Sequence, residues 1–252
     1  MNDVKLARAV KQANTQSNYF QKLSYRVSQQ IEQYRLKGHA EEPFWKWICS
    51  WARACRKPSD LGFQDNDFKL PELIEKDHVI MPDRPAEGML FTVRALGLAQ
   101  EREERKRTLK QRCEFVAGLV DHDRPSVIWC HMNTEGELLN EIIPDSVEVS
   151  GSTPDEKREE IYLAFAAGQI KRLITKPKIG AWGMNWQHCH DTVTFASHSY
   201  EQYYQSIRRF LRFGQKHPVT VHRVATEGER HVFDNMNRKA DATDKMFTEL
   251  VK

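Results

Sequence analysis

Gln205, Arg208, Arg209 and Arg212 are clustered in residues 200–213, a segment whose apolar spacing predicts a helix. At about 100° per residue, these four side chains project from one side of the helix, opposite an apolar face. Arginines held this close repel one another, and a phosphate facing them would remove the repulsion while accepting forked hydrogen bonds. The pattern therefore indicates a phosphate site, and the alternative is a solvated basic face.

A second candidate is the loop at residues 175–187, TKPKIGAWGMNWQ, which follows a short apolar run. Lys176 and Lys178 can meet phosphate groups, and the glycines allow the backbone to approach a ligand closely. Trp182 and Trp186 could stack on nucleic-acid bases. The alternative is a loop that packs against its own domain.

The segments that must position these side chains alternate between strand and helix patterns after Pro125, with short connections. This alternation predicts a parallel sheet covered by helices on both faces, with ligands bound beyond the carboxyl ends of the strands. Upstream, we expect a helix at 41–56, an extended segment at 68–81 and one long charged helix at 96–120. From Pro125 on, we expect strands at 126–132, 146–151, 170–175, 191–197 and 219–225, and helices at 134–142, 153–168, 200–213 and 228–251.

The order of four motifs resembles the C-terminal lobe of Swi/Snf-type superfamily 2 helicases, with features of a phage-like branch. The motifs are VIWCHMN, VSGSTPDEKR, LITKPKIGAWGMNW and YEQYYQSIRRFLRFGQ. The family pattern Gln-x-x-Gly-Arg-x-x-Arg-x-Gly-Gln is matched by Gln205, Arg209, Arg212, Gly214 and Gln215. The preceding family motif, Ser/Thr followed by Gly-x-Asn-Leu, is matched by Thr175, Gly183 and Asn185. The resemblance covers roughly residues 68–226 and implies a RecA-like α/β fold.

The resemblance also implies roles for individual residues. Arg209 and Arg212 would be arginine fingers for the γ-phosphate of ATP, which binds with Mg²⁺ to a first lobe. Gln205 would align them or sense the nucleotide. Gly183 and Asn185 would take part in nucleotide binding and, together with Thr175, would couple it to DNA.

Lys176 and Lys178 are predicted to contact the DNA backbone, an assignment that the family pattern itself does not fix. Two positions depart from the family pattern, since Arg208 replaces its Gly and Trp186 replaces its Leu.

The sequence contains neither a Gly-x-x-x-x-Gly-Lys-Ser/Thr loop nor a DEAH-like box. We therefore expect residues 1–67 to be a helical inter-lobe extension and residues 68–252 to be the second lobe, inactive in ATP hydrolysis without a first lobe. On this reading the chain is a fragment or the product of a split gene. The alternative is a non-catalytic DNA-binding or regulatory remnant.

Other chemistries are less well supported by the sequence. His188, Cys189 and His190 are adjacent, and adjacent side chains diverge, so we predict no metal site. Cys130 ends an apolar run, where a cysteine usually packs in the core.

Composition limits the class of protein further. The chain has 252 residues, a net charge of +3 and 40% apolar residues, enough for a core. Five scattered cysteines argue against a disulfide framework. No apolar run is long enough to span a bilayer, so we expect no membrane partner and a cytoplasmic location, in a bacterium or a phage-infected host cell.

Overall fold

The computed structural model describes residues 38–52, 55–66, 68–84, 94–95, 97–181 and 183–251. The chain divides into two compact units, one of residues 55–248 and the other of residues 1–54 with 249–252. In the second unit the structure describes α2 (Gly38–Cys49) and the end of the C-terminal helix, where the Cys49 thiol lies 3.5 Å from the Glu249 carbonyl oxygen. Most of the predicted extension, residues 1–37, lies outside the described residues.

The larger unit begins at Cys55, upstream of the lobe boundary expected at residue 68. Arg56 forms an ion pair with Asp244 at 2.6 Å. The ring of Phe68 stacks on Phe213, with 4.7 Å between ring centroids. Arg56, which the sequence assigned to the extension, thus contacts the C-terminal helix within the larger unit.

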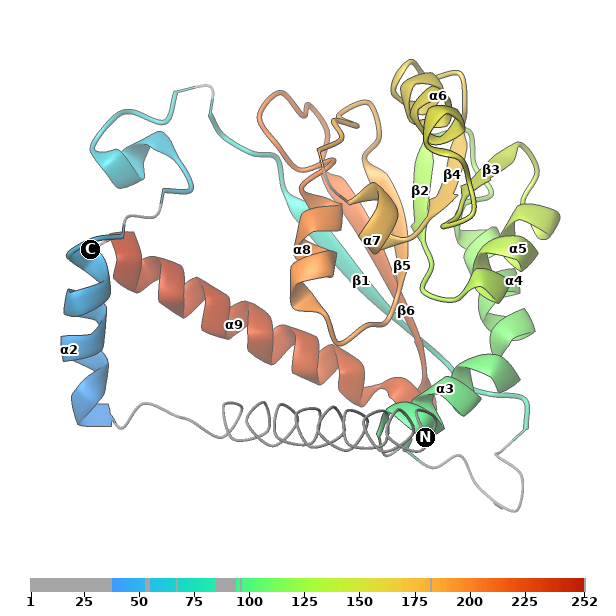
Figure 1. Cartoon of the computed structure of the whole chain (residues 1–252), viewed down its shortest axis with the longest axis horizontal. Coiled ribbons are helices and arrows are strands. Elements are labelled where there is room, and N and C mark those ends of the chain that lie inside the picture. Colours follow the sequence, from blue (N-terminus) through green and yellow to red (C-terminus); the bar gives the residue numbers. More distant parts are fainter. Residues whose placement is uncertain are drawn as a thin grey trace, which may run out of the picture. The chain divides into compact units, whose positions relative to one another are not determined.

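Six strands form one parallel sheet in the described part of the larger unit, in the order β1-β6-β5-β2-β4-β3 (Figure 1). The long pair at one edge runs in register from Leu73 beside Val219 to Ile80 beside Thr226. The strands are β1 (Leu73–Ile80), β2 (Ser126–Trp129), β3 (Ser146–Val149), β4 (Arg172–Thr175), β5 (Asp191–Phe195) and β6 (Val219–Thr226). The predicted fold class, a RecA-like α/β sheet with helices on both faces, is confirmed.

Two hydrophobic clusters cover the two faces of the sheet, because alternate strand residues point to opposite sides. One cluster holds Val127 and Trp129 together with side chains of α6 (Asp155–Ala166), α8 (Tyr200–Ile207) and α9 (His231–Val251). The other holds Ile128 and Cys130 together with side chains of α4 (Leu109–Leu119) and α5 (Asn133–Ile142). The remaining helices are α3 (Leu98–Arg107) and the short α7 (Pro177–Gly180).

Two predicted helices differ from the structure. The charged segment expected as one long helix is two helices, α3 and α4, which meet at Thr108. The helix expected at 200–213 ends at Ile207, and a turn carries the chain through Arg208 to Phe210. This second difference changes how the arginines are arranged. Within the described residues, no helix is long and apolar enough to cross a membrane.

Candidate phosphate-facing arginine site

Arg209 and Arg212 converge on one backbone oxygen. Arg209 Nη1 donates to the Met184 carbonyl at 3.0 Å, and Arg212 Nη1 donates to the same oxygen at 3.3 Å. Arg209 Nε also donates to the Gln205 carbonyl at 3.1 Å. Burial, and secondly the charge of Arg212, lower the pKa of Arg209. Two guanidinium groups are thus held together at a half-buried position.

The third arginine lies elsewhere, contrary to the helical prediction. Arg208 is the residue that caps α8, and its guanidinium carbon lies 4.8 Å from the centroid of the Tyr204 ring, one turn earlier. Its Nη1 lies 3.5 Å from the Leu211 carbonyl oxygen. The predicted face of Gln205 with three arginines is therefore reduced to Arg209 and Arg212.

The turn that carries the arginines is fixed by its neighbours in sequence. Phe210 and Leu211 are buried in the core. The buried Gln215 amide nitrogen donates to the carbonyls of Gln187 and Cys189, at 2.9 and 3.1 Å. Since Cys189 lies two residues before the start of β5, these bonds tie the turn to the amino edge of the sheet.

Trp186 anchors the loop that supplies the Met184 carbonyl. Its side chain is fully buried, with ring centroids 5.4 Å from Phe165, 5.5 Å from Tyr162 and 6.0 Å from Trp129. Its backbone N–H donates to the Arg209 carbonyl at 3.0 Å. Trp186 is thus unavailable for base stacking, and Trp182 lies outside the described residues.

Gly183 and Asn185 are exposed on the same loop, and Gly183 has a φ of 77°, a conformation that favours glycine. Together with Arg158 and Tyr162 of α6 they line an open groove of about 560 Å³. Arg158 belongs to the motif after β3. The groove therefore brings two of the four sequence motifs side by side.

The remaining predicted residues, Thr175, Lys176 and Lys178, lie at or just after the carboxyl end of β4. Thr175 is fully buried, and its hydroxyl donates to the Val149 carbonyl at 3.1 Å, so it does not offer that group to the surface. Lys176 Nζ donates to the Asn133 side-chain oxygen. Lys178 is exposed on α7.

The candidate residues therefore occupy two edges of the sheet, whereas the sequence interpretation placed all of them at the carboxyl edge. Lys176 directly follows β4, and its partner Asn133 lies shortly after β2, so this pair marks the carboxyl edge. Arg209 and Arg212 lie near the amino edge, because α8 starts after the end of β5 and runs antiparallel to it. A single small ligand at the carboxyl edge would not meet both groups.

The cysteines and histidines that the sequence analysis considered as nucleophile or metal ligands are packed against other side chains. Burial raises the pKa of the Cys130 and Cys189 thiols to about 12, which leaves them protonated and poor nucleophiles. The rings of His188 and His190 contact different partners, Phe165 and His217, with centroids 4.8 and 4.9 Å apart.

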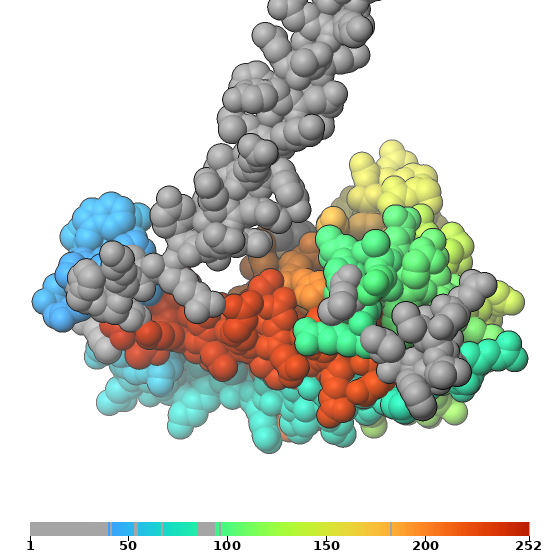
Figure 2. All heavy atoms as spheres, turned by 90° about the horizontal axis from the view of Figure 1, so that it is seen from below, coloured from blue at the N-terminus to red at the C-terminus, as the bar shows by residue number. Residues whose placement is uncertain are grey.

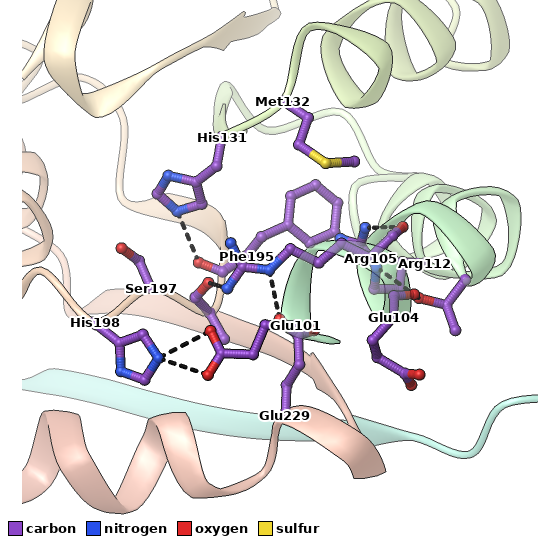
Figure 3. Close-up of polar contacts among 12 residues, drawn as sticks. Glu101, Glu104, Arg105, Arg112, His131, Met132, Phe195, Ser197, His198 and Glu229 are labelled. Atoms are coloured by element: carbon purple, nitrogen blue, oxygen red, sulfur yellow. Dashed lines mark hydrogen bonds and ion pairs between the residues drawn. The ribbon is translucent and has the colours of Figure 1, made fainter. Parts of the chain in front are cut away.

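The sequence interpretation missed a buried polar network formed by α3, α4, the start of α5 and the turn that follows β6 (Figure 3). Arg112 donates to Glu135 at 2.8 Å, and Glu135 also accepts the backbone N–H groups of His131 and Met132. Arg105 donates to Glu229 at 2.5 Å. Their partners lie 23 or more residues away in sequence, so local spacing gave no signal.

No model of a known protein family matches this chain, and no curated protein matches it. Among solved structures, the C-terminal part of the Fun30 ATPase domain is 18% identical with a TM-score of 0.43, and the match covers 49% of this chain and 43% of that one. A DEAD box protein from Methanococcus jannaschii is 14% identical with a TM-score of 0.48, covering 68% of this chain and 40% of that one.

The Escherichia coli DEAD-box protein SrmB, solved bound to regulator of ribonuclease activity A, is 15% identical with a TM-score of 0.46. That match covers 52% of this chain and 79% of the SrmB chain. The present chain thus spans less than half of the first two structures. Similarity at this level carries no functional conclusion, so function has to be inferred from the residues themselves.

Proposed function

We propose that this chain is the second RecA-like lobe of an ATP-dependent DNA helicase or translocase, and that Arg209 and Arg212 are its arginine fingers. One observation carries the proposal. The two arginines of one helicase-like motif are held by the Met184 carbonyl, which lies between Gly183 and Asn185 of the preceding motif. Two motifs recognised separately in the sequence are thus in direct contact.

The chemistry of the pair suits a phosphate. Among the described residues, no carboxylate lies within ion-pair distance of Arg209 or Arg212. A carbonyl oxygen carries only a partial charge, so a desolvated pair of cations here would gain from a nearby oxyanion. Arginines placed in this way stabilise the charge that develops during phosphoryl transfer.

A first lobe would hold ATP with Mg²⁺, and this ATP would supply the phosphoryl group that is transferred. Arg209 and Arg212 would face its γ-phosphate. Gln205, whose carbonyl accepts from Arg209, would position the pair. The exposed Gly183 and Asn185 would contribute to the nucleotide site from the adjoining loop.

DNA would be contacted at the carboxyl edge, by Lys176 and Lys178. Both are cations near a helix start, and exposed lysines bind phosphate backbones without reading sequence. Thr175 would act through its backbone and through the packing of β4, because its hydroxyl is committed to Val149. The motif order further suggests a Swi/Snf-type enzyme of a phage-like branch, acting in the cytoplasm of a bacterium or of a phage-infected host.

The test is DNA-stimulated ATP hydrolysis by the full chain, alone and mixed with its cognate first lobe. We expect activity in the mixture, and we expect Arg212→Ala to lower it by about 10³-fold or more. Arg208→Ala is the matched control, because it removes a neighbouring guanidinium that lies over Tyr204, and it should retain activity. An equal loss in both variants would contradict the finger assignment.

The alternative function is a DNA-binding or regulatory remnant. It is favoured by the lack of a phosphate-binding loop and DEAH-like box in the sequence. It predicts salt-dependent DNA binding that is lost in Lys176→Ala/Lys178→Ala, with no ATP hydrolysis when the first lobe is present. A mixture that hydrolyses ATP would rule it out.

A further inference from the structure

Three potential metal ligands converge at a place that the helicase-like motifs do not use. His198 Nε2 lies 3.0 Å from both carboxylate oxygens of Glu101. His231 Nε2 lies 3.1 Å from Oε1 of the same carboxylate. One ligand atom from each of the three residues lies within 4.8 Å of the other two.

These ligands come from three segments far apart in the sequence. Glu101 is on α3, His198 lies between β5 and α8, and His231 is the first residue of α9. The space-filling view shows the surface of α3 next to that of α9 (Figure 2). Figure 3 shows the ring of His198 turned toward the Glu101 carboxylate. An ion bound here would join all three segments.

The ligand set and the spacing suit a divalent transition metal. Two imidazoles and one carboxylate form a donor set found in zinc sites that keep an open position. At Zn–ligand distances of about 2.0–2.1 Å, ligand atoms of a tetrahedral site are about 3.3 Å apart. The separations of Glu101 from His198 and from His231, 3.0 and 3.1 Å, need to open by only a few tenths of an ångström, and the two histidine ligand atoms lie within 4.8 Å of each other.

The surroundings supply access and outer contacts. The Glu101 and His231 side chains are 5% and 13% exposed, whereas His198 is 31% exposed, which leaves a route for an ion and a water ligand. Asn235 lies 3.0 Å from His198 Nδ1. With a metal on Nε2 the ring proton lies on Nδ1, so the Asn235 amide would have to turn its oxygen toward Nδ1 and give up the hydrogen bond that this oxygen accepts from Arg238 at 2.8 Å.

Three neighbouring groups affect how well the site would hold a cation. The His231 Nδ1 atom is buried without a hydrogen-bond partner among the described residues, so a metal on Nε2 would leave the Nδ1 proton without an acceptor there. The nearby Arg105 charge is balanced by Glu229 at 2.5 Å. Lys239 opposes a cation, because its ammonium donates to the His198 carbonyl at 2.6 Å.

We propose that Glu101, His198 and His231 form a binding site for one Zn²⁺ ion, which clamps α3 and the start of α9 to the loop after β5. The site stands apart from Arg209 and Arg212, and it does not depend on the proposed function. An ion there would brace the strand end that leads into α8.

The experiment uses the full chain without a histidine tag, stripped with a chelator and then titrated with Co²⁺ as a spectroscopic probe and with Zn²⁺ in competition. We expect one Co²⁺ per chain with visible d–d absorption, displaced by Zn²⁺, and a rise in Tm with Zn²⁺ that Mg²⁺ does not produce. Glu101→Gln and His231→Ala should each weaken Zn²⁺ binding by at least about 100-fold, since even outer-shell changes cost about 10–100-fold.

Two controls keep the result specific. His217→Ala and His222→Ala each disrupt another close histidine pair, His190–His217 or His78–His222, and both should leave the Co²⁺ spectrum unchanged. His198→Gln changes the most exposed ligand, and it replaces His231→Ala in the binding test if that variant does not fold. Absence of Co²⁺ absorption, or Zn²⁺ binding that survives both Glu101→Gln and His198→Gln, would overturn the proposal.

Discussion

Two arginine pairs in this molecule have opposite surroundings. Arg105 and Arg112, on consecutive helices, each donate to a buried carboxylate, Glu229 at 2.5 Å and Glu135 at 2.8 Å. Arg209 and Arg212 share only backbone carbonyls. Both pairs are shielded from water to some degree, yet only the first has its charge neutralised within the described chain.

The difference separates structural arginines from arginines available to a ligand. A buried guanidinium paired with a carboxylate has its hydrogen bonds and its charge satisfied, so an additional anion gains little there. A guanidinium bonded to a carbonyl keeps most of its donors and its full charge free. The surroundings of an arginine, more than its position in a motif, thus indicate where phosphate can bind.

The largest effect on stability is expected from the structural pair. Arg112→Ala leaves Glu135, whose side chain is 0% exposed, as an uncompensated buried charge, so the free energy of unfolding should fall by about 3–5 kcal/mol. Urea unfolding followed by circular dichroism measures this loss. The double change Arg112→Met with Glu135→Leu removes both charges and should recover much of it. A loss below about 1 kcal/mol for Arg112→Ala would contradict the structural assignment.

A comparable or smaller loss of stability is expected when Trp186, which anchors the loop bound by Arg209 and Arg212, is replaced. Trp186→Ala should lower the free energy of unfolding by about 3–5 kcal/mol, since a fully buried ring among several aromatic neighbours is removed. Trp186→Leu, the residue of the family pattern, should lose less because it refills part of the volume. If Trp186→Leu unfolds the chain as readily as alanine does, the aromatic packing is more specific than volume alone explains.

The sequence predicted the fold well, because buried strands and amphipathic helices leave local periodic patterns. All six strands and most helices lie where apolar spacing placed them. The end of α8 was not predictable in this way. Arg208 to Phe210 keep a helical residue pattern, but the burial of Phe210 and the hydrogen bonds of Gln215 impose a turn.

The closeness of Arg209 and Arg212 was predicted from the sequence, whereas the arrangement of the side chains around them was not. Arg209 and Arg212 were singled out correctly as a close pair, whereas Arg208 is diverted to the Tyr204 ring. The contacts of Arg112 with Glu135 and of Glu101 with His198 span long sequence separations. They depend on how helices pack on the sheet, which local spacing does not record.

Lowering the pH should lower the stability of the fold through His131, which lies beside the Arg112–Glu135 pair. Burial lowers the pKa of His131, which is hydrogen-bonded at 3.2 Å to the Phe195 carbonyl and whose backbone N–H donates to Glu135. A histidine with a lowered folded-state pKa stabilises the fold fully above its ordinary value of 6.5 and loses that contribution as the pH falls below it.

Tm should therefore decrease as the pH falls from about 7.5 to 5.5. His131→Gln should reduce that slope. Other buried histidines, among them His78 and His222, have pKa values lowered by burial and account for the slope that remains. An unaltered slope in His131→Gln would show that its protonation is not linked to unfolding.

The smallest effect on stability is expected at the ligand-facing arginines. Arg212 contributes one hydrogen bond of 3.3 Å to a neutral carbonyl and is partly exposed, so Arg212→Ala should change the free energy of unfolding by less than about 1 kcal/mol. Urea unfolding of Arg212→Ala beside Arg112→Ala measures the contrast directly. If removing Arg212 also relieves repulsion on Arg209, whose pKa is lowered partly by that neighbour, the variant is as stable as the parent chain or more so. An arginine that contributes little to folding and carries an unbalanced charge is the kind that a phosphate ligand would stabilise. A loss as large as that of Arg112→Ala would instead make Arg212 a structural residue and remove the distinction between the two pairs.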